Sequence, residues 1–169
     1  MEPRLRTFVY QHVGGFERRS RPREVDLPLL DGMLVTVYRL FTVGYTSLLD
    51  SRLGLDVAQV MDSWRNQGPR YDYAIVGNRR ELFVAQLLGV FQLTVRGEKH
   101  SIAYVRHFKI NGRSKATGYI ELTNLYSQEF ILTEWILRLC IVISPSIQES
   151  THVLWDLEGS DMYLRLQNL

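Results

Sequence analysis

The segment that most constrains the fold is residues 81–109, with the sequence ELFVAQLLGVFQLTVRGEKHSIAYVRHFK. In its first half the odd positions from 83 to 95 are all apolar or small, whereas the even positions change from apolar to polar. This pattern is typical of a long strand with one face in a core and the other face covered over part of its length. Residues 96–99 supply a turn in which Gly97 can adopt a positive φ, and residues 102–110 return as a second strand. We therefore predict a long β-hairpin. A helix is the alternative, since Phe83, Leu87 and Val90 also fit a helical stripe.

Size and composition favour a single globular domain. The chain has 169 residues, of which 46% are hydrophobic, and this is enough for a sizeable core. The formal net charge of +2 is too small to indicate nucleic-acid binding by itself. The single cysteine, Cys140, lies in an apolar run and reads as a small buried hydrophobe, so we expect a reducing intracellular compartment. We expect neither a secretory signal nor a membrane-spanning segment, because no stretch approaches the ~18 apolar residues of a span.

Residues 1–24 read as a basic, partly disordered arm. Six arginines outnumber three glutamates there, and the densest run is FERRSRPRE at 16–24. Arginine suits phosphate because its planar guanidinium can donate two parallel hydrogen bonds. A polar, basic loop follows at residues 111–115. The candidate nucleic-acid contacts are Arg18, Arg19, Arg21, Arg23, Arg113 and Lys115. A solvated tail without a partner is the alternative interpretation of the arm.

Short strands separated by turn signals account for most of the remaining chain. Residues 33–48 predict a strand or bent pair of strands, with Gly44 at a bulge or bend. A turn is expected at Thr123-Asn124 and a final turn at residues 162–166. Further strands are expected at residues 71–76, 117–122, 126–133, 135–143 and 151–157.

One helix is predicted in the region of residues 56–64. Asp56 is a good N-cap, and Gln59 completes a capping-box pattern. An apolar stripe follows, and Gly68-Pro69 ends the helix. The stripe consists of Val57, Val60, Met61 and Trp64. The whole pattern predicts a mainly β fold (β-rich α+β), namely a partly open barrel of about six to eight strands with one short packed helix, in which residues 25–169 form a single domain.

Motifs for catalysis or cofactor binding are missing from the sequence. The four histidines are not spaced for a helical metal site, and one cysteine excludes a structural zinc site in practice. We find neither a dinucleotide fingerprint, nor a P-loop, nor a nucleophile elbow. Asp72 beside Arg70 reads as a turn or salt-bridge residue, and His107 as a satisfied histidine in an apolar strand. We therefore expect no enzymatic activity, no cofactor and no metal. An unrecognised small enzyme is a further hypothesis, which would need a deep pocket with convergent titratable groups.

Five short motifs occur in an order that resembles a known family. They are RLFTVGYTSL at 39–48, GPRYD at 68–72, FVAQLLGVF at 83–91, IAYVRHF at 102–108 and DMYLRL at 161–166. This string resembles the C-terminal β-rich region of large proteins encoded by fungal transposable elements of the Plavaka and KDZ kind, over about residues 35–167. That region looks in turn like a bromo-adjacent homology (BAH) fold, a β-barrel-like interaction module of chromatin proteins. Gln86 stands where both families usually carry an arginine.

The resemblance implies an interaction module of transposon-derived origin that acts without nuclease activity, in the nucleus, on a protein partner. It transfers no catalytic residues, because BAH-like domains carry none. A nucleic-acid-binding accessory domain that uses the basic arm is the second hypothesis. A degenerate fragment of an element, without a selected function, is another.

Overall fold

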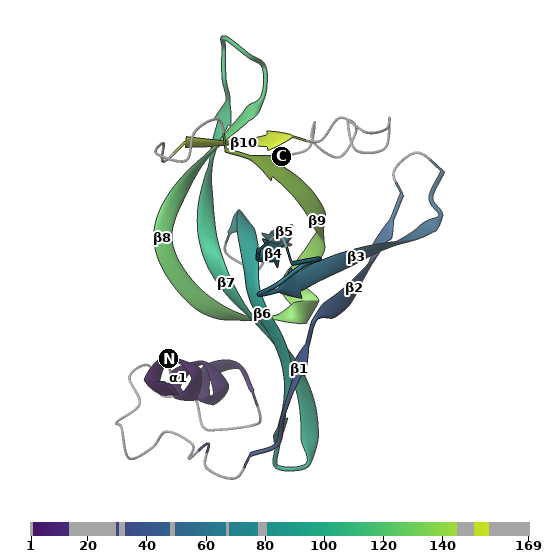
Figure 1. Cartoon of the computed structure of the whole chain (residues 1–169), viewed down its shortest axis with the longest axis vertical. Helices are drawn as coiled ribbons and strands as arrows, with labels where there is room; N and C mark the ends of the chain where they lie inside the picture. Colours follow the sequence, from purple (N-terminus) through teal and green to yellow (C-terminus); the bar gives the residue numbers. More distant parts are fainter. Residues whose placement is uncertain are drawn as a thin grey trace.

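The structure is a computed structural model that describes residues 2–13, 30, 33–47, 50–66, 68–77, 81–144 and 151–155. Nearly all the secondary structure in this part of the chain is β-strand (Figure 1). The main sheet has seven strands, within the expected six to eight, and three further strands form a second sheet. The predicted mainly β, partly open barrel is confirmed.

The predicted long hairpin is present, so the helical alternative for these residues is wrong. Strand β6 (Leu82–Val95) pairs antiparallel with β7 (Glu98–Arg113) along almost its whole length. Arg96 and Gly97 form the two-residue turn, with φ of +52° and +83°. Both angles are positive, as a type I′ hairpin turn requires. A shift in register between Leu87 and Gly89 accommodates one extra residue in β6.

Six strands of the main sheet form a ring of hydrogen-bonded pairs. The ring includes β5 (Tyr73–Gly77), β8 (Ile120–Leu132), β9 (Ile136–Ile143) and β10 (Thr151–Trp155). The pairs follow the order β6–β5–β9–β10–β8–β7, and β7 pairs back onto β6. Because β9 pairs with β10 over only three residue positions, the barrel is partly open on that side. The short 3-10 turn η2 (Thr133–Trp135) joins β8 to β9, and β1 (Val35–Tyr38) extends the sheet beside β6.

Strands β5 and β6 are buried on both faces, as their apolar sequences predict. Ile75 and Val84 belong to a core cluster that draws side chains from all six ring strands, which we call the interior cluster. Ala74 and Ala85 point to the opposite face, because side chains alternate along a strand. They join a second cluster, which also contains residues of the hairpin formed by β2 and β3, described below. We call it the hairpin-side cluster. Cys140 lies in the interior cluster and is buried, as expected.

The predicted helix at residues 56–64 is wrong, because β3 (Leu53–Met61) occupies most of this region. It pairs with β2 (Leu40–Thr46) over seven residue positions, and with the two-residue strand β4 (Arg70–Tyr71) on its other side. The helical stripe and the capping pattern are local signals, whereas the ladder with β2 and burial of Ala58 and Val60 are tertiary interactions that outweigh them. The bend expected at Gly44 lies instead at Arg39, between β1 and β2.

Residues 2–13 of the predicted arm pack against the barrel. Glu2–His12 forms a helix, α1, that packs against β8 and η2 (Figure 1). Phe8 is 7% exposed, and its ring centroid lies 6.1 Å from that of Phe130 and 6.4 Å from that of Trp135. The arginines at 4 and 6 contribute to the basic character that predicts an arm. Burial of Phe8, Val9 and Val13 determines where this segment packs. Residues 14–24 of the predicted arm lie outside the described residues.

Strand β8 continues through the turn expected at Thr123-Asn124. Tyr126 adopts a φ of +55°, and the pairing register with β7 shifts nearby, between Arg106 and Phe108. The side-chain oxygen of Asn124 accepts a hydrogen bond from the Tyr126 N–H at 2.8 Å, which supports this local distortion. The turn signal in the sequence therefore marks an irregularity within one strand. The final turn expected at residues 162–166 lies outside the described residues.

Candidate interaction surface on the β2–β3 hairpin

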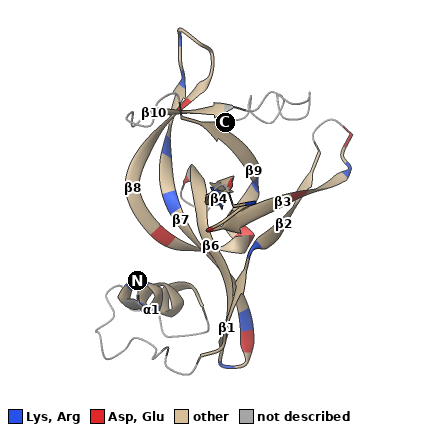
Figure 2. Cartoon of the chain, in the orientation of Figure 1, with Lys and Arg blue, Asp and Glu red and all other residues tan. Residues whose placement is uncertain are grey.

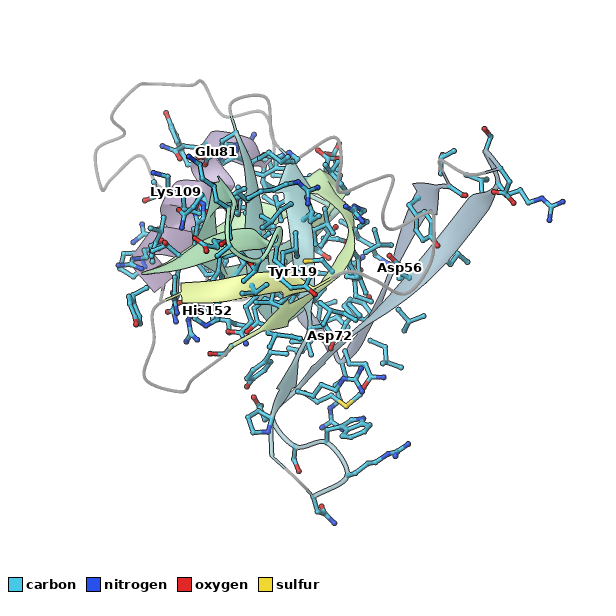
Figure 3. The ribbon with its side chains drawn as sticks, turned by 90° about the horizontal axis from the view of Figure 1, so that it is seen from above. Asp56, Asp72, Glu81, Lys109, Tyr119 and His152 are labelled. Carbon is cyan, nitrogen blue, oxygen red and sulfur yellow. The ribbon has the colours of Figure 1, made fainter. Side chains whose placement is uncertain are left out.

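The β2–β3 hairpin projects from the barrel. In Figure 1 it extends past β9, and the view from above in Figure 3 shows the same separation of its far end from the body of the molecule. Buried side chains attach the part of the hairpin nearest the barrel to the core. Val43 of β2 and Ala58 and Val60 of β3 lie on the inner face of the hairpin and belong to the hairpin-side cluster.

Two carboxylates attach β3 to its surroundings, and both are labelled in Figure 3. Asp56 Oδ2 accepts a hydrogen bond from the backbone N–H of Leu139 on β9 at 3.2 Å. Asp72 Oδ2 accepts from the backbone N–H of Gln59 at 2.7 Å, and its Oδ1 lies 3.2 Å from Arg70 Nε. The predicted salt-bridge role of Asp72 is confirmed. Asp56 does accept from a backbone N–H, as an N-cap would, but that N–H belongs to a strand far along the chain.

The outer face of the hairpin is apolar and carries no charge. The pairing register places Leu40, Thr42, Gly44 and Thr46 of β2 beside Gln59, Val57, Leu55 and Leu53 of β3. The aliphatic side chains are exposed, at 54% for Leu40, 86% for Leu53, 73% for Leu55 and 55% for Val57. In Figure 2 the hairpin is tan over most of its length, with a red band on β3 and further charged residues near its far end. Contiguous apolar patches are often interaction sites, which makes this face the candidate surface.

The outer face has a ridge beside a trough. Leu53, Leu55 and Val57 form the ridge on β3, whereas their β2 neighbours are the smaller Thr46, Gly44 and Thr42. A Cβ atom added at Gly44 would have only one side-chain atom nearby, Leu55 Cδ2 at 3.9 Å. The trough is therefore open above β2. β2 is also the edge strand of the second sheet, since its described pairing partner is β3 alone.

Of the predicted nucleic-acid contacts, the structure describes Arg113 and Lys115. Arg18, Arg19, Arg21 and Arg23 lie outside the described residues. Arg113 and Lys115 are exposed near the end of the β7–β8 hairpin, where Arg113 Nη1 donates to the carbonyl of Gly118 at 3.1 Å. That end lies opposite α1 in Figure 1, and Figure 2 shows the described lysines and arginines spread over several strands and hairpin ends.

A row of polar side chains crosses the barrel on the face of the interior cluster. The pairing register aligns Tyr73, Gln86, Arg106 and Gln128 on four neighbouring strands. Arg106 Nη1 donates to Gln86 Oε1 at 3.1 Å. Burial raises the pKa of the Tyr73 hydroxyl above its usual value of 10.0, and the nearby Arg106 guanidinium opposes this shift. These contacts stabilise the barrel.

The described histidines and carboxylates do not form a metal site. Among the residues that the structure describes, no three His, Cys, Asp or Glu side chains are grouped to hold a metal ion. His107 Nδ1 lies 3.2 Å from Glu129 Oε1, and its ring centroid lies 4.0 Å from that of Phe83. This arrangement matches the satisfied histidine that the sequence predicted. Within the same described ranges, no helix has the length and apolar character needed to cross a membrane.

Comparison with known proteins adds no relative. No family model matches the chain, and neither a curated protein nor a solved structure matches it. The function is therefore inferred from the chemistry of the surface itself.

Proposed function

We propose that this chain is a non-enzymatic interaction module that binds a protein partner through the outer face of the β2–β3 hairpin. One observation carries the proposal. Four aliphatic side chains, each more than half exposed, share an uncharged face on a hairpin whose base is buried in the core. The largest apolar patch on a monomer is often functional, and burial of such a patch by a partner is favourable.

The energetics support a real but modest interaction. The four side chains present roughly 400 Å² of apolar surface, which at about 25 cal/mol per Å² corresponds to about 10 kcal/mol of gross stabilisation when fully covered. Association costs on the order of 4–15 kcal/mol in lost translational and rotational freedom. The surface therefore suits a reversible complex. It is also held in place before binding, because Asp56 and the inner face attach the base of the hairpin to the barrel.

The resemblance to the C-terminal region of fungal transposon proteins belongs to this proposal. A BAH-like barrel that presents a partner-binding hairpin in the nucleus would fit both the resemblance and the exposed face. The transposon-derived origin, the nuclear location and the absence of enzymatic activity stay predictions.

Affinity capture with matched variants tests the proposal. Leu55→Lys adds a charge to the middle of the outer face, at a side chain that is already exposed and therefore tolerant of substitution. Leu125→Lys is the control, because Leu125 is also exposed but lies on β8. We expect the unmodified chain and Leu125→Lys to capture the same partner and Leu55→Lys to lose it. Equal capture by all three would refute the role of this face.

Nucleic-acid binding is the second candidate function, favoured by the exposed Arg113 and Lys115 on a hairpin that extends from the barrel. Removal of residues 1–24 would also remove buried residues of α1, so substitution is the better test. The four arm arginines are changed to Gln in one variant, and Arg113 and Lys115 in another. DNA and RNA binding is then measured at two salt concentrations. Phosphate contacts predict a loss of affinity of roughly 0.9 log unit per log unit of salt for each contact. An affinity that neither salt nor these substitutions change would refute this function.

A further inference from the structure

We infer that the partner of the β2–β3 outer face is a second copy of this chain, packed face to face about a two-fold axis. The inference rests on the proposed function, because it identifies the occupant of the same surface. Three features of the face lead to it: its shape, its lack of charge and its position on the molecule.

The shape of the outer face is complementary to itself. The ridge of Leu53, Leu55 and Val57 stands beside a trough of small residues on the same hairpin. A two-fold axis parallel to the strands places β3 of one copy over β2 of the other. In this arrangement Leu55 of each copy lies over Gly44 of its partner, because these two residues are already neighbours across the hairpin. An axis perpendicular to the strands in the same plane would stack ridge on ridge and leave the troughs empty, which is unfavourable because interfaces pack densely.

The charge distribution suits two identical faces. None of the eight outer-face residues is charged, while Asp56 lies on the inner face with its carboxylate engaged by the Leu139 N–H. A charged partner would have no complementary group on this face. A second copy brings the same neutral surface, so no like charges meet when the two faces are desolvated.

The position of the hairpin leaves room for the second copy. Packed sheets lie about 10 Å apart. The inner face of each hairpin packs against the barrel of its own copy. The paired hairpins would therefore lie between the two barrels. Both Figure 1 and Figure 3 show the hairpin extending away from the barrel. The four aliphatic side chains of its outer face are more than half exposed.

The size of the face predicts a weak dimer. Roughly 400 Å² per copy is about half of the ~800 Å² per partner that standard stable interfaces bury. We therefore expect a reversible monomer–dimer equilibrium that is visible in the micromolar range and depends on concentration.

Sedimentation velocity and light scattering of the full chain, from about 1 to 500 μM, test the inference. The unmodified chain and the control Leu125→Lys are expected to dimerise with the same dissociation constant. Gly44→Leu fills the trough and is expected to weaken the dimer at least tenfold. It should fold normally, because Gly44 has no positive φ and its added Cβ meets only Leu55. A chain that stays monomeric at 500 μM, or a Gly44→Leu variant that dimerises like the unmodified chain, overturns the inference.

A compensating pair of substitutions tests the packing itself. Gly44→Leu combined with Leu55→Ala moves bulk from the ridge to the trough, so the double variant is expected to recover dimerisation that Gly44→Leu loses. Failure to recover overturns the ridge-in-trough arrangement. The outcome for the proposed function is separate: a monomeric chain that still loses its captured partner through Leu55→Lys refutes the second copy and supports a different protein on the same face.

Discussion

The attachment of the hairpin to the barrel provides the sharpest stability prediction, through Asp56. Its carboxylate is half-buried and accepts from the Leu139 N–H at 3.2 Å, across two elements distant in sequence. Asp56→Ala removes the acceptor and leaves this N–H without its partner. A charge-assisted hydrogen bond of this kind contributes about 1.5–3 kcal/mol. We expect a decrease of about 2 kcal/mol in the free energy of unfolding.

Urea denaturation measures this decrease. With a denaturant dependence of about 2 kcal/mol per M, the midpoint should fall by about 1 M. Asp56→Asn keeps an oxygen acceptor but loses the charge, so about half of that shift is expected. Asp50→Asn is the matched control: Asp50 forms an exposed ion pair with Arg52 near the far end of the hairpin, and its loss should cost less than about 0.5 kcal/mol.

Hydrogen exchange locates the effect. The Leu139 amide should lose protection roughly 30-fold in Asp56→Ala, in step with about 2 kcal/mol. An Asp56→Ala variant with an unchanged midpoint and an unchanged Leu139 exchange rate would refute the argument that this contact holds the hairpin in place.

Three further predictions test other parts of the fold. Phe8→Ala should lower the free energy of unfolding by about 3 kcal/mol in urea denaturation, because the ring is buried, whereas Gln11→Ala on the exposed side of α1 should change it little. Gly97→Val should cost about 1–2 kcal/mol in the same assay, entirely through its positive φ, since a Cβ there would meet no atom; an unchanged midpoint would contradict the turn assignment. Burial raises the pKa of Tyr73, so its protonated form stabilises the fold fully below about pH 10 and this contribution is lost as pH rises through the raised pKa. Denaturation midpoints above pH 10 should therefore fall less steeply in Tyr73→Phe, and equal slopes would count against burial as the cause.

The central hairpin could be predicted from sequence because its signals are local and agree with one another. The alternation in residues 82–95, the Gly97 turn and the return strand all favour the same structure, and neighbouring strands cover both faces as the apolar pattern requires. The expected strands at residues 135–143 and 151–157 correspond to β9 and β10 for the same reason. The ring of pairs was foreseeable only as a class of fold, since pairing of β10 with β8 and β9 depends on long-range contacts.

The segment around Asp56 and Gln59 shows why the remainder could not be predicted. The Asp56 carboxylate does accept from a backbone N–H, as an N-cap would, but the donor is Leu139 on β9. Gln59 meets Asp72 through its backbone: its N–H donates to the Asp72 carboxylate, and its C=O accepts from the Asp72 N–H. A sequence shows that a side chain can accept a hydrogen bond, but it does not show which distant backbone N–H the fold will bring to it. Similarly, the arginines of the α1 segment predict a basic arm. The apolar residues of the same segment contact Phe130 and Trp135 only in the folded chain, so their packing could not be predicted.

The candidate site lies in the segment where local sequence signals predict a helix. Val57 was assigned to a helical stripe in a core, whereas alternation of Leu53, Leu55 and Val57 with Gly54, Asp56 and Ala58 is the strand signal that could have revealed the exposed face. The apolar side chain of Val57 predicts burial, yet in the single chain this residue is 55% exposed. The residues of an interface that buries its apolar side chains have the composition of a core, so a pattern that reads as core but lies on the surface is what a partner-binding face should look like. If the second copy covers this face, the expectation of burial is met in the dimer and fails only in the isolated chain.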